Sequence, residues 1–218
     1  MVMKKVLIVV CALFSIVVVA QRGHKDSNRI GISGGLTQMS IFTDNFNVTP
    51  QQGWTGGFHV RGNFYNDWQM SFGMFFTDSN FSVQTRKVVS VVDTNYKLSA
   101  VQIYIMPGYV ISQNHFNIEF GPVLQINDKL VIDKDQENNF LVDQPLLTAK
   151  DIVDVTKINA NIYAGINVGF TNVRLRLGYQ YGVNNFFNSL NSNDKVPNIG
   201  EKFKGNIGMA SGQLTIYL

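Results

Sequence analysis

Cysteine is nearly absent from this chain, since Cys11 is the single example among 218 residues. It lies inside an apolar N-terminal stretch, where a lipid anchor is disfavoured. Charged side chains are also scarce at 15%, whereas ordinary domains carry roughly a quarter. Beyond residue 20, no apolar run approaches the roughly 18 residues that indicate a membrane-spanning helix. These absences exclude a disulfide framework, a thiolate metal site and a helical membrane protein.

The first twenty residues have the pattern of a secretory signal peptide. Lys4 and Lys5 form a positive start, residues 6–19 are almost wholly apolar, and Ala20 ends a small-residue cleavage pattern. We therefore expect cleavage near Ala20, followed by a short periplasmic tail over residues 21–27. A single anchored helix is the alternative interpretation of this segment.

The mature chain is close to electrical neutrality. The leader holds two of the 18 basic residues and none of the 15 acidic ones, which leaves a net charge of +1. Nucleic-acid binding calls for clustered Lys and Arg, so no nucleic-acid partner is expected. An exported chain with 12% aromatic residues and few charges belongs to one of two classes. One is a secreted β-sandwich or ligand-binding barrel, and the other is a membrane barrel.

Apolar and polar residues alternate over most of the chain, which indicates strands with two unlike faces. From Trp68 to Phe76, for example, every second residue is large and apolar. We expect the final strand to pair with the first and so to close the sheet. The alternating segments predict eight antiparallel strands, at residues 28–41, 53–65, 68–83, 96–110, 115–126, 156–169, 172–182 and 204–218.

Short and long connections alternate between these strands. Outer-membrane barrels have short periplasmic turns and long extracellular loops, so the pattern predicts an all-β, eight-stranded, up-and-down transmembrane β-barrel over residues 28–218. The long connections are polar, and we expect them to bury little apolar surface and to be poorly ordered. The short connections lie around 65–67, 112–114 and 170–172, and the long ones cover 42–52, 84–95, 127–155 and 183–203.

The polar face of the strands carries charges in mid-strand. In a membrane barrel this face points inward, and we expect a lumen charge network of His59, Arg61, Glu119, Arg174 and Arg176. Aromatic residues near strand ends favour the lipid–water boundary. The predicted lipid-facing or girdle residues are Trp54, Phe58, Trp68, Phe72, Phe76, Phe116, Phe120, Tyr179 and Tyr181, with further boundary aromatics at Tyr65, Phe81, Tyr109, Phe170 and Tyr217.

Two segments resemble a known family. His115–Leu124 (HFNIEFGPVL) is similar to the aromatic–x–x–E–x–G–P strand of PorT-like outer-membrane β-barrel proteins. Leu175–Asn185 (LRLGYQYGVNN) is similar to the R–Y–x–Y–G–L–x–N strand end of the same family. The resemblance implies an integral outer-membrane protein of a Gram-negative bacterium. Some members of the family assist protein secretion across that membrane.

No catalytic, metal or cofactor site is expected. Of the three histidines, only His59 lies in the interior of a predicted strand, because His24 lies in the N-terminal tail and His115 at a short turn. No nucleophile and acid accompany His59 at a spacing typical of a triad. The acidic segment 133–137 is interleaved with lysine and lacks the glycine turn of a calcium loop. The glycines at 31–35 lie inside a strand pattern and do not form a phosphate cradle.

The sequence therefore predicts a monomeric outer-membrane barrel that is not an enzyme. Its partners would be outer-membrane lipid and, through loops 127–155 and 183–203, other envelope proteins. Its role would be structural or interactive, as an accessory to protein secretion or surface assembly. The alternative is a secreted, soluble, lipocalin-like β-barrel that binds an apolar ligand, with the apolar face pointing inward.

Overall fold

A computed structural model describes residues 28–87, 90–194, 196–197 and 200–218. The predicted signal peptide and the tail 21–27 lie outside these residues. Within them the chain forms nine antiparallel strands and two short 3-10 helices, η1 (Ala149–Ile152) and η2 (Leu190–Ser192). The strands are β1 (Arg29–Phe42), β2 (Val48–Tyr65), β3 (Trp68–Lys87), β4 (Ser90–Ser112), β5 (Phe116–Asn127), β6 (Phe140–Leu141), β7 (Ile158–Gly169), β8 (Val173–Gly182) and β9 (Asn206–Tyr217).

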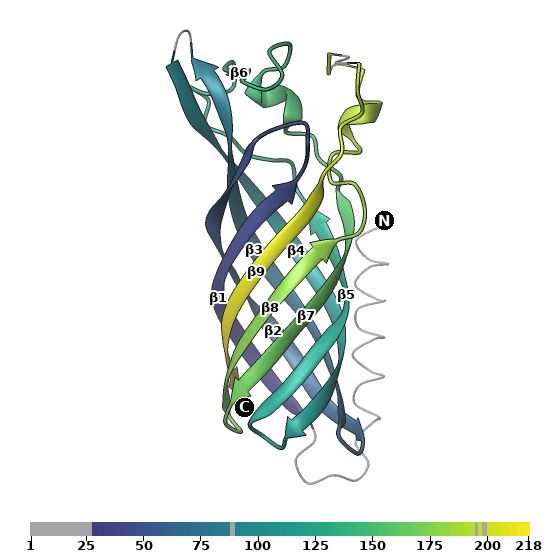
Figure 1. Ribbon diagram of the computed structural model, residues 1–218. Helices are drawn as coiled ribbons and strands as arrows, with labels where there is room; N and C mark the ends of the chain where they lie inside the picture. The colour runs from purple at the N-terminus through teal and green to yellow at the C-terminus, as the bar shows by residue number, and fades with distance from the viewer. Residues whose placement is uncertain (1–27, 88–89, 195, 198–199) are drawn as a thin grey trace, which may run out of the picture.

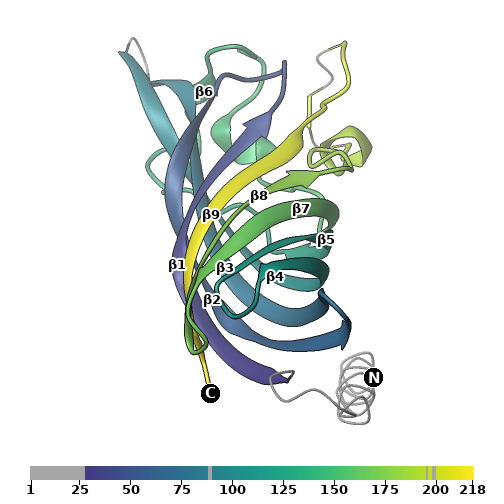
Figure 2. The ribbon, with the colours of Figure 1, turned by 60° about the horizontal axis from the view of Figure 1, so that its bottom comes forward.

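The long strands close into a barrel. Each of them pairs antiparallel with its neighbours in the chain, and β5 pairs with β7 because the two-residue β6 lies outside the wall, against the end of β3. As predicted, β9 pairs with β1, from Gly31 opposite Tyr217 to Phe42 opposite Asn206. This pairing leaves the wall without an open edge. Figure 2 shows the strands wrapping around a common axis.

The short connections lie at one end of the barrel and the long connections at the other (Figure 1). Two short turns contain an asparagine with positive φ, Asn66 at 47° and Asn114 at 61°. Asparagine is one of the few residues that adopts this left-handed conformation readily. These turn residues therefore suit tight reversals between neighbouring strands.

Two predicted loops are wrong in extent: β2 already begins at Val48, inside the predicted loop 42–52, and the loop 84–95 differs most. The segment 84–95 is mostly strand, because β3 continues to Lys87 and β4 begins at Ser90. The segment is rich in Val and Thr, which favour extended structure. The hydroxyls of Thr85 and Thr94 hydrogen-bond across the hairpin at 2.7 Å. The hairpin consequently projects beyond the rest of the wall (Figure 1).

The long connections were expected to bury little apolar surface. This prediction is wrong. Many of their apolar side chains gather in a buried cluster at the long-loop end of the barrel, which we call the loop cap. Each member is at most 4% exposed, and the cluster packs on barrel residues such as Met39 and Ile207. The loop cap consists of Phe46, Leu130, Leu141, Leu147, Ala149, Ile152, Val155, Phe186, Phe187, Leu190 and Phe203.

The wall has a polar inner face and an apolar outer face. Along β5, for example, Ile118 and Phe120 are 43% and 53% exposed, whereas Asn117 and Glu119 are buried. The same alternation makes Leu175 on β8 44% exposed. We call the outer apolar surface the exterior belt. None of the helices in the described part of the chain has the length and hydrophobicity needed to cross a bilayer.

Candidate functional site

The five residues expected in the lumen all point inward. His59 and Arg61 come from β2, Glu119 from β5, and Arg174 and Arg176 from β8, and each is at most 4% exposed. Since side chains alternate along a strand, residues of equal parity on one strand share a face. These five residues form two clusters, and ring contacts of His59 with Phe75 and Tyr104 join the clusters.

The first cluster is built around Arg176. Its Nε donates to Glu119 Oε1 in a fully buried ion pair. The guanidinium also lies over two aromatic rings, 4.5 Å from the centroid of Tyr104 and 4.7 Å from that of Tyr163. Burying a charge is costly unless it is paired and hydrogen-bonded. The carboxylate and the two ring faces together compensate for the loss of water around Arg176.

The second cluster surrounds Tyr217 on β9. The guanidinium carbons of Arg61 and Arg174 lie 4.7 Å and 5.9 Å from the centre of its ring. His59 Nε2 lies 2.9 Å from the Tyr217 hydroxyl, and His59 Nδ1 lies 3.3 Å from the hydroxyl of Ser33. Tyr217 thus links the histidine to both arginines.

The placement of two boundary aromatics was wrong. Tyr217 is 5% exposed and lies inside the lumen, and Phe81 is 0% exposed and packs at the loop cap. Both lie near strand ends, which suggested a girdle position. Side chains alternate between the two faces of a strand. On β9 the outward positions belong to Leu214 and Ile216, so Tyr217 points into the lumen.

A layer of side-chain amides lies between the charged residues and the loop cap. Gln125 Oε1 accepts hydrogen bonds from Gln102 at 2.8 Å, Gln180 at 3.1 Å and Asn161 at 3.2 Å. Gln125 Nε2 in turn donates to Asn127 Oδ1 at 2.7 Å. These hydrogen bonds connect side chains from four strands of the wall, β4, β5, β7 and β8.

Glycine makes room for the rings of the lumen. A β-carbon at Gly178 would lie 2.1 Å from the Tyr163 hydroxyl oxygen, and one at Gly165 would lie 2.3 Å from it. Two small cavities occur among the inward side chains, with volumes of about 20 and 10 Å³. Each is close to the space that one water molecule needs, about 10–15 Å³. At these levels the lumen is filled by side chains, as expected for a narrow barrel.

The predicted lipid-facing residues point outward or lie half-buried in the wall. Trp54, Phe58, Trp68, Phe76, Phe120, Tyr179 and Tyr181 are 36% to 53% exposed. Phe72 and Phe116 are half-buried. An exposed apolar surface of this extent is unusual for a soluble monomer and marks a contact with lipid or protein. The arrangement is the reverse of the apolar interior that a lipocalin-like ligand barrel requires.

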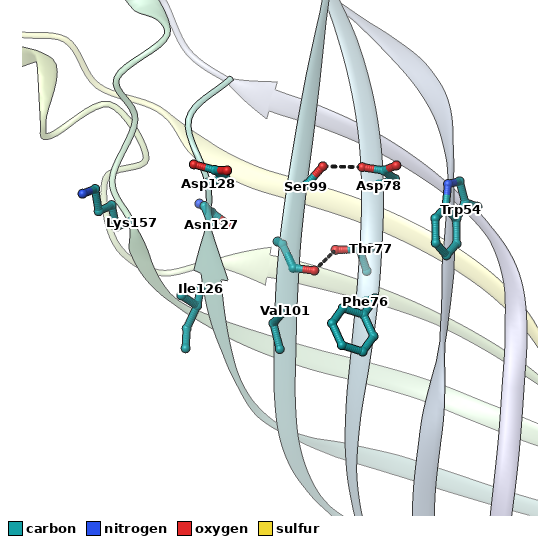
Figure 3. Close-up of a pocket in the computed structure, with 11 residues that line it drawn as sticks. Trp54, Phe76, Thr77, Asp78, Ser99, Val101, Ile126, Asn127, Asp128 and Lys157 are labelled. Carbon is teal, nitrogen blue, oxygen red and sulfur yellow. Dashed lines mark hydrogen bonds between the residues drawn. The ribbon is translucent and has the colours of Figure 1, made fainter. Parts of the chain in front are cut away.

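A groove of about 530 Å³ lies at the margin of the exterior belt that is nearest the long loops. Val101 on β4 forms its floor and lies in register with Phe76 on β3 and Ile126 on β5. Figure 3 shows these three apolar side chains in one row, with a polar row on the side of the long loops. We call this feature the rim groove. Its other side-chain lining includes Trp54, Asp78, Ser99, Asn127, Asp128 and Lys157.

One wall of the rim groove carries an ion pair. Lys97 Nζ lies 2.8 Å from Asp78 Oδ2. The Ser99 hydroxyl donates to Asp78 Oδ1 at 2.5 Å, as Figure 3 shows. Asp78 is therefore held by two donors from the neighbouring strand. Across the part of the chain that the structure describes, no three His, Cys, Asp or Glu side chains form a metal-binding group.

Comparison with known proteins gives matches in structure. No protein-family model matches the chain, and no curated protein matches it in sequence. The attachment invasion locus protein Ail of Yersinia pestis, in its complex with the heparin analogue sucrose octasulfate, is 12% identical, with a TM-score of 0.50 that covers 88% of this chain and 99% of Ail. The chain has the fold of a small outer-membrane β-barrel protein.

Two further solved structures are similar to this outer-membrane β-barrel. OprG of Pseudomonas aeruginosa is 12% identical, with a TM-score of 0.49 that covers 90% of this chain and 98% of OprG. Neisserial surface protein A is 12% identical, with a TM-score of 0.47 that covers 86% of this chain and 96% of that protein. Identities this low concern the fold and do not extend to ligands or partners.

Several residues of this outer-membrane β-barrel interior were not singled out from the sequence. Tyr104 and Tyr163 flank Arg176, and Gln125 is the hub of the amide layer. Inward and outward residues alternate in this fold, so strand parity identifies all three as inward. Parity does not say which inward residues meet across the lumen, because that depends on the stagger between strands.

Proposed function

We propose that the chain is an integral outer-membrane protein of a Gram-negative bacterium, with its short turns in the periplasm and its long loops outside the cell. The observation that carries this proposal is the exterior belt, in which apolar residues such as Phe120 and Leu175 are 53% and 44% exposed while Glu119 and Arg176 are buried. In water this surface would oppose folding as a monomer, whereas lipid removes the penalty.

The barrel serves, in this proposal, as a monomeric anchor that presents the loop cap to other envelope proteins or to partners outside the cell. The filled lumen supports a role other than a diffusion pore. A non-enzymatic role is supported by the hydrogen bonds of the buried His59, whose partners are the hydroxyls of Ser33 and Tyr217. A catalytic histidine would instead need a nucleophile at a substrate-accessible position and an orienting acid.

An accessory role in protein secretion is the second candidate, and the PorT-like resemblance favours it. Glu119 belongs to the first family-like segment and Arg176 to the second, and these two residues form the buried ion pair of the lumen. The pairing ties both segments to the packing of one barrel. Deletion of the gene tests the secretion role, which is wrong if secretion and surface display remain unchanged.

Fractionation and site-directed spin labelling test the membrane assignment. We expect the protein in the outer-membrane fraction, soluble only with detergent, and with different gel migration before and after boiling. The mature sequence has no cysteine, so a single introduced cysteine gives one labelled site. A label at Phe76→Cys should be accessible to oxygen dissolved in lipid, and its neighbour Thr77→Cys, which is buried in the lumen, is the matched control. A protein found in the soluble periplasm would contradict the proposal.

A further inference from the structure

The β3–β4 hairpin has an uncovered backbone edge where it projects beyond the barrel wall. We propose that this edge binds an extended strand of a partner protein, which lies next to β4 and places a basic side chain opposite Asp93. The inference deepens the proposed function and rests on it, because the hairpin lies at the long-loop end that would face partners outside the cell (Figure 1). We call the backbone of residues 90–95 on β4 the hairpin edge.

The two sides of the hairpin differ in how their backbone groups are paired. On the β3 side, β2 pairs with the strand up to Val83, and β6 then pairs with Thr85 and Arg86. On the β4 side, the last cover is Val131, which shares two backbone hydrogen bonds of 2.9 Å with Lys97. Within the described residues, no strand or loop pairs with that side of β4 between Lys97 and the tip of the hairpin. The hairpin therefore has one covered side and one open side.

The pairing of Lys97 shows which backbone groups point away from the hairpin. Its N–H and C=O both bond to Val131, so both are directed away from β3. Backbone groups alternate in direction along an antiparallel strand, and Val91, Asp93 and Asn95 therefore direct theirs the same way. Among the described residues, none of these three has a backbone hydrogen bond on that side. They offer a row of donors and acceptors that an added strand of about five residues would pair with.

The exposed face of the hairpin provides side-chain contacts beside the hairpin edge. Phe140 on β6, Arg86 on β3 and Val91 on β4 lie in one register row across the three strands. Phe140 and Val91 are both 52% exposed. The next exposed residues along β4 are Asp93 and Asn95. An added strand would therefore extend the row at Val91 and meet a carboxylate at the next outward position.

A second copy of this chain fits the hairpin edge poorly. Two identical edges related by a two-fold axis pair antiparallel, with each residue contacting its symmetric counterpart. Because Lys97 is already paired with Val131, the available residues 91–95 would align with Asp93 opposite Asp93 of the other copy. Like charges directly opposite each other destabilise a sheet, and a charge in the middle of an edge protects against such association. The occupant is therefore a different protein.

The hairpin edge specifies a sequence pattern for the partner strand. Within the described residues, no basic side chain lies within 4.0 Å of the Asp93 carboxylate, so a partner can supply the opposite charge. Antiparallel pairing, the more stable arrangement per residue, places a polar residue opposite Asn95, Lys or Arg opposite Asp93, and Val or Ile opposite Val91. Main-chain hydrogen bonds give such a strand its affinity, and the alternate side chains give specificity. The expected ligand pattern is therefore Thr-x-Lys-x-Val.

Peptide binding to the full chain in detergent micelles tests the charge at Asp93. The probe is a short fluorescent peptide with Thr-Thr-Lys-Thr-Val at its centre, and the comparison peptide has Glu in place of Lys. The titration extends to about 1 mM, because a single short strand binds weakly. We expect the Lys peptide to bind with a Kd about fivefold lower than that of the Glu peptide. Asp93→Lys should reverse this preference, whereas Asp135→Asn, which changes an exposed acid on another long connection, should leave it unchanged.

Two backbone changes distinguish strand addition from charge attraction alone. N-methylation of the peptide at the residue opposite Asp93 removes an N–H that would face β4, and we expect it to raise the Kd at least about fivefold. N-methylation of the next residue, whose N–H would face solvent, is the matched control and should change the Kd by less than about twofold. Asp93→Pro removes an outward N–H and leaves the β3–β4 hydrogen bonds in place, so it should weaken binding more than Asp93→Asn does. Each variant is first checked for the shift in gel migration on boiling, so that loss of folding is not mistaken for loss of binding.

Absence of binding by the Lys peptide, equal binding of the Lys and Glu peptides, or equal effects of the two N-methyl groups would each overturn the inference. A dimer of the full chain that Asp93→Pro dissociates would show that a second copy occupies the hairpin edge, which also overturns it. Fractionation scores the proposed membrane location separately. A heat-modifiable barrel in the membrane fraction that fails the binding tests refutes the hairpin edge alone, whereas a soluble protein refutes the proposed function as well.

Discussion

Arg176 carries a charge that is buried deep in the barrel interior. It pairs with Glu119 and lies against the rings of Tyr104 and Tyr163. Buried ion pairs contribute little net stability compared with apolar residues of equal size. Removing one partner, however, leaves an uncompensated charge, which is strongly destabilising. The pair therefore specifies how the strands meet more than it adds to the free energy of unfolding.

Glu119→Gln tests this asymmetry. We expect the free energy of unfolding to fall by about 3–5 kcal/mol, because Arg176 would stay charged in the lumen without its counter-ion. The double variant Glu119→Leu/Arg176→Met should lose less than Glu119→Gln alone. Denaturant unfolding in detergent micelles or liposomes measures both values. An unchanged unfolding midpoint for Glu119→Gln would contradict this account of the ion pair.

Gly178→Ala tests the packing around Tyr163. The added methyl group would overlap the ring, 2.1 Å from its hydroxyl oxygen and 2.2 Å from the adjacent ring carbon. We expect a loss of about 1–3 kcal/mol, the usual range for overpacking a filled interior. Gly34→Ala is the control, because a β-carbon there meets nothing within 4 Å. Equal unfolding midpoints for the two variants would disprove the steric role of Gly178.

At the scale of elements, the long connections behave as one packed unit. Phe46 from the first long connection lies against Phe187 and Phe203 from the last, with ring centroids 5.6 and 6.0 Å apart. The Tyr96 hydroxyl on β4 donates to the carbonyl oxygen of Ala149 in η1 at 3.0 Å. Loops from three parts of the sequence are thus fastened to one another and to the wall.

Phe186→Ala should loosen the loop cap and spare the barrel. Phe186 is 0% exposed, and truncation of a buried phenylalanine costs about 3–5 kcal/mol. We expect limited proteolysis within residues 183–205 to become about a hundredfold faster, because cleavage follows the population of the open loop. Leu146→Ala, at a position that is 66% exposed, is the control. Gel migration before and after boiling should not change in either variant.

The sequence predicts the strands well where alternation is strict and uninterrupted. The segment 172–182 was expected as a strand, and β8 runs from Val173 to Gly182. The loop cap was not predicted, because its apolar residues are scattered among polar ones and find partners in remote segments. Phe46 and Phe187, for instance, share no local pattern. The orientation of Arg61 and Arg174 toward Tyr217 likewise depends on the closed geometry, which period-two alternation does not encode.

At the scale of the whole molecule, the interior changes character along the barrel axis. Arginine and tyrosine occupy the turn-proximal and middle levels, side-chain amides follow, and the loop cap lies at the long-loop end. The cavity of about 10 Å³ lies within the level of arginine and tyrosine, and the cavity of about 20 Å³ lies at the boundary between that level and the side-chain amides. A column filled in this way has little room for a row of water molecules.

Planar-bilayer recordings test whether the filled interior blocks ions. We expect no stepwise conductance from the reconstituted wild-type protein, because the charged pair, the amide layer and the loop cap obstruct the axis in series. A porin reconstituted in the same lipid is the positive control, since its wider barrel leaves an aqueous channel. Regular single-channel steps from the wild-type protein would show that water crosses the lumen.

The pairing of β1 with β9 has a consequence for how the molecule is made. Ser33 and Thr215 share a hydrogen bond although 182 positions separate them in the chain. Contacts between such distant segments form late and slowly. The barrel therefore stays open until β9 is available to pair with β1. Until then, its apolar outer surface is not covered by lipid. In the proposed topology, Phe186 and Phe187 must also cross the bilayer before the barrel closes. We therefore expect the unfolded chain to need a chaperone that covers its apolar residues until β1 and β9 pair.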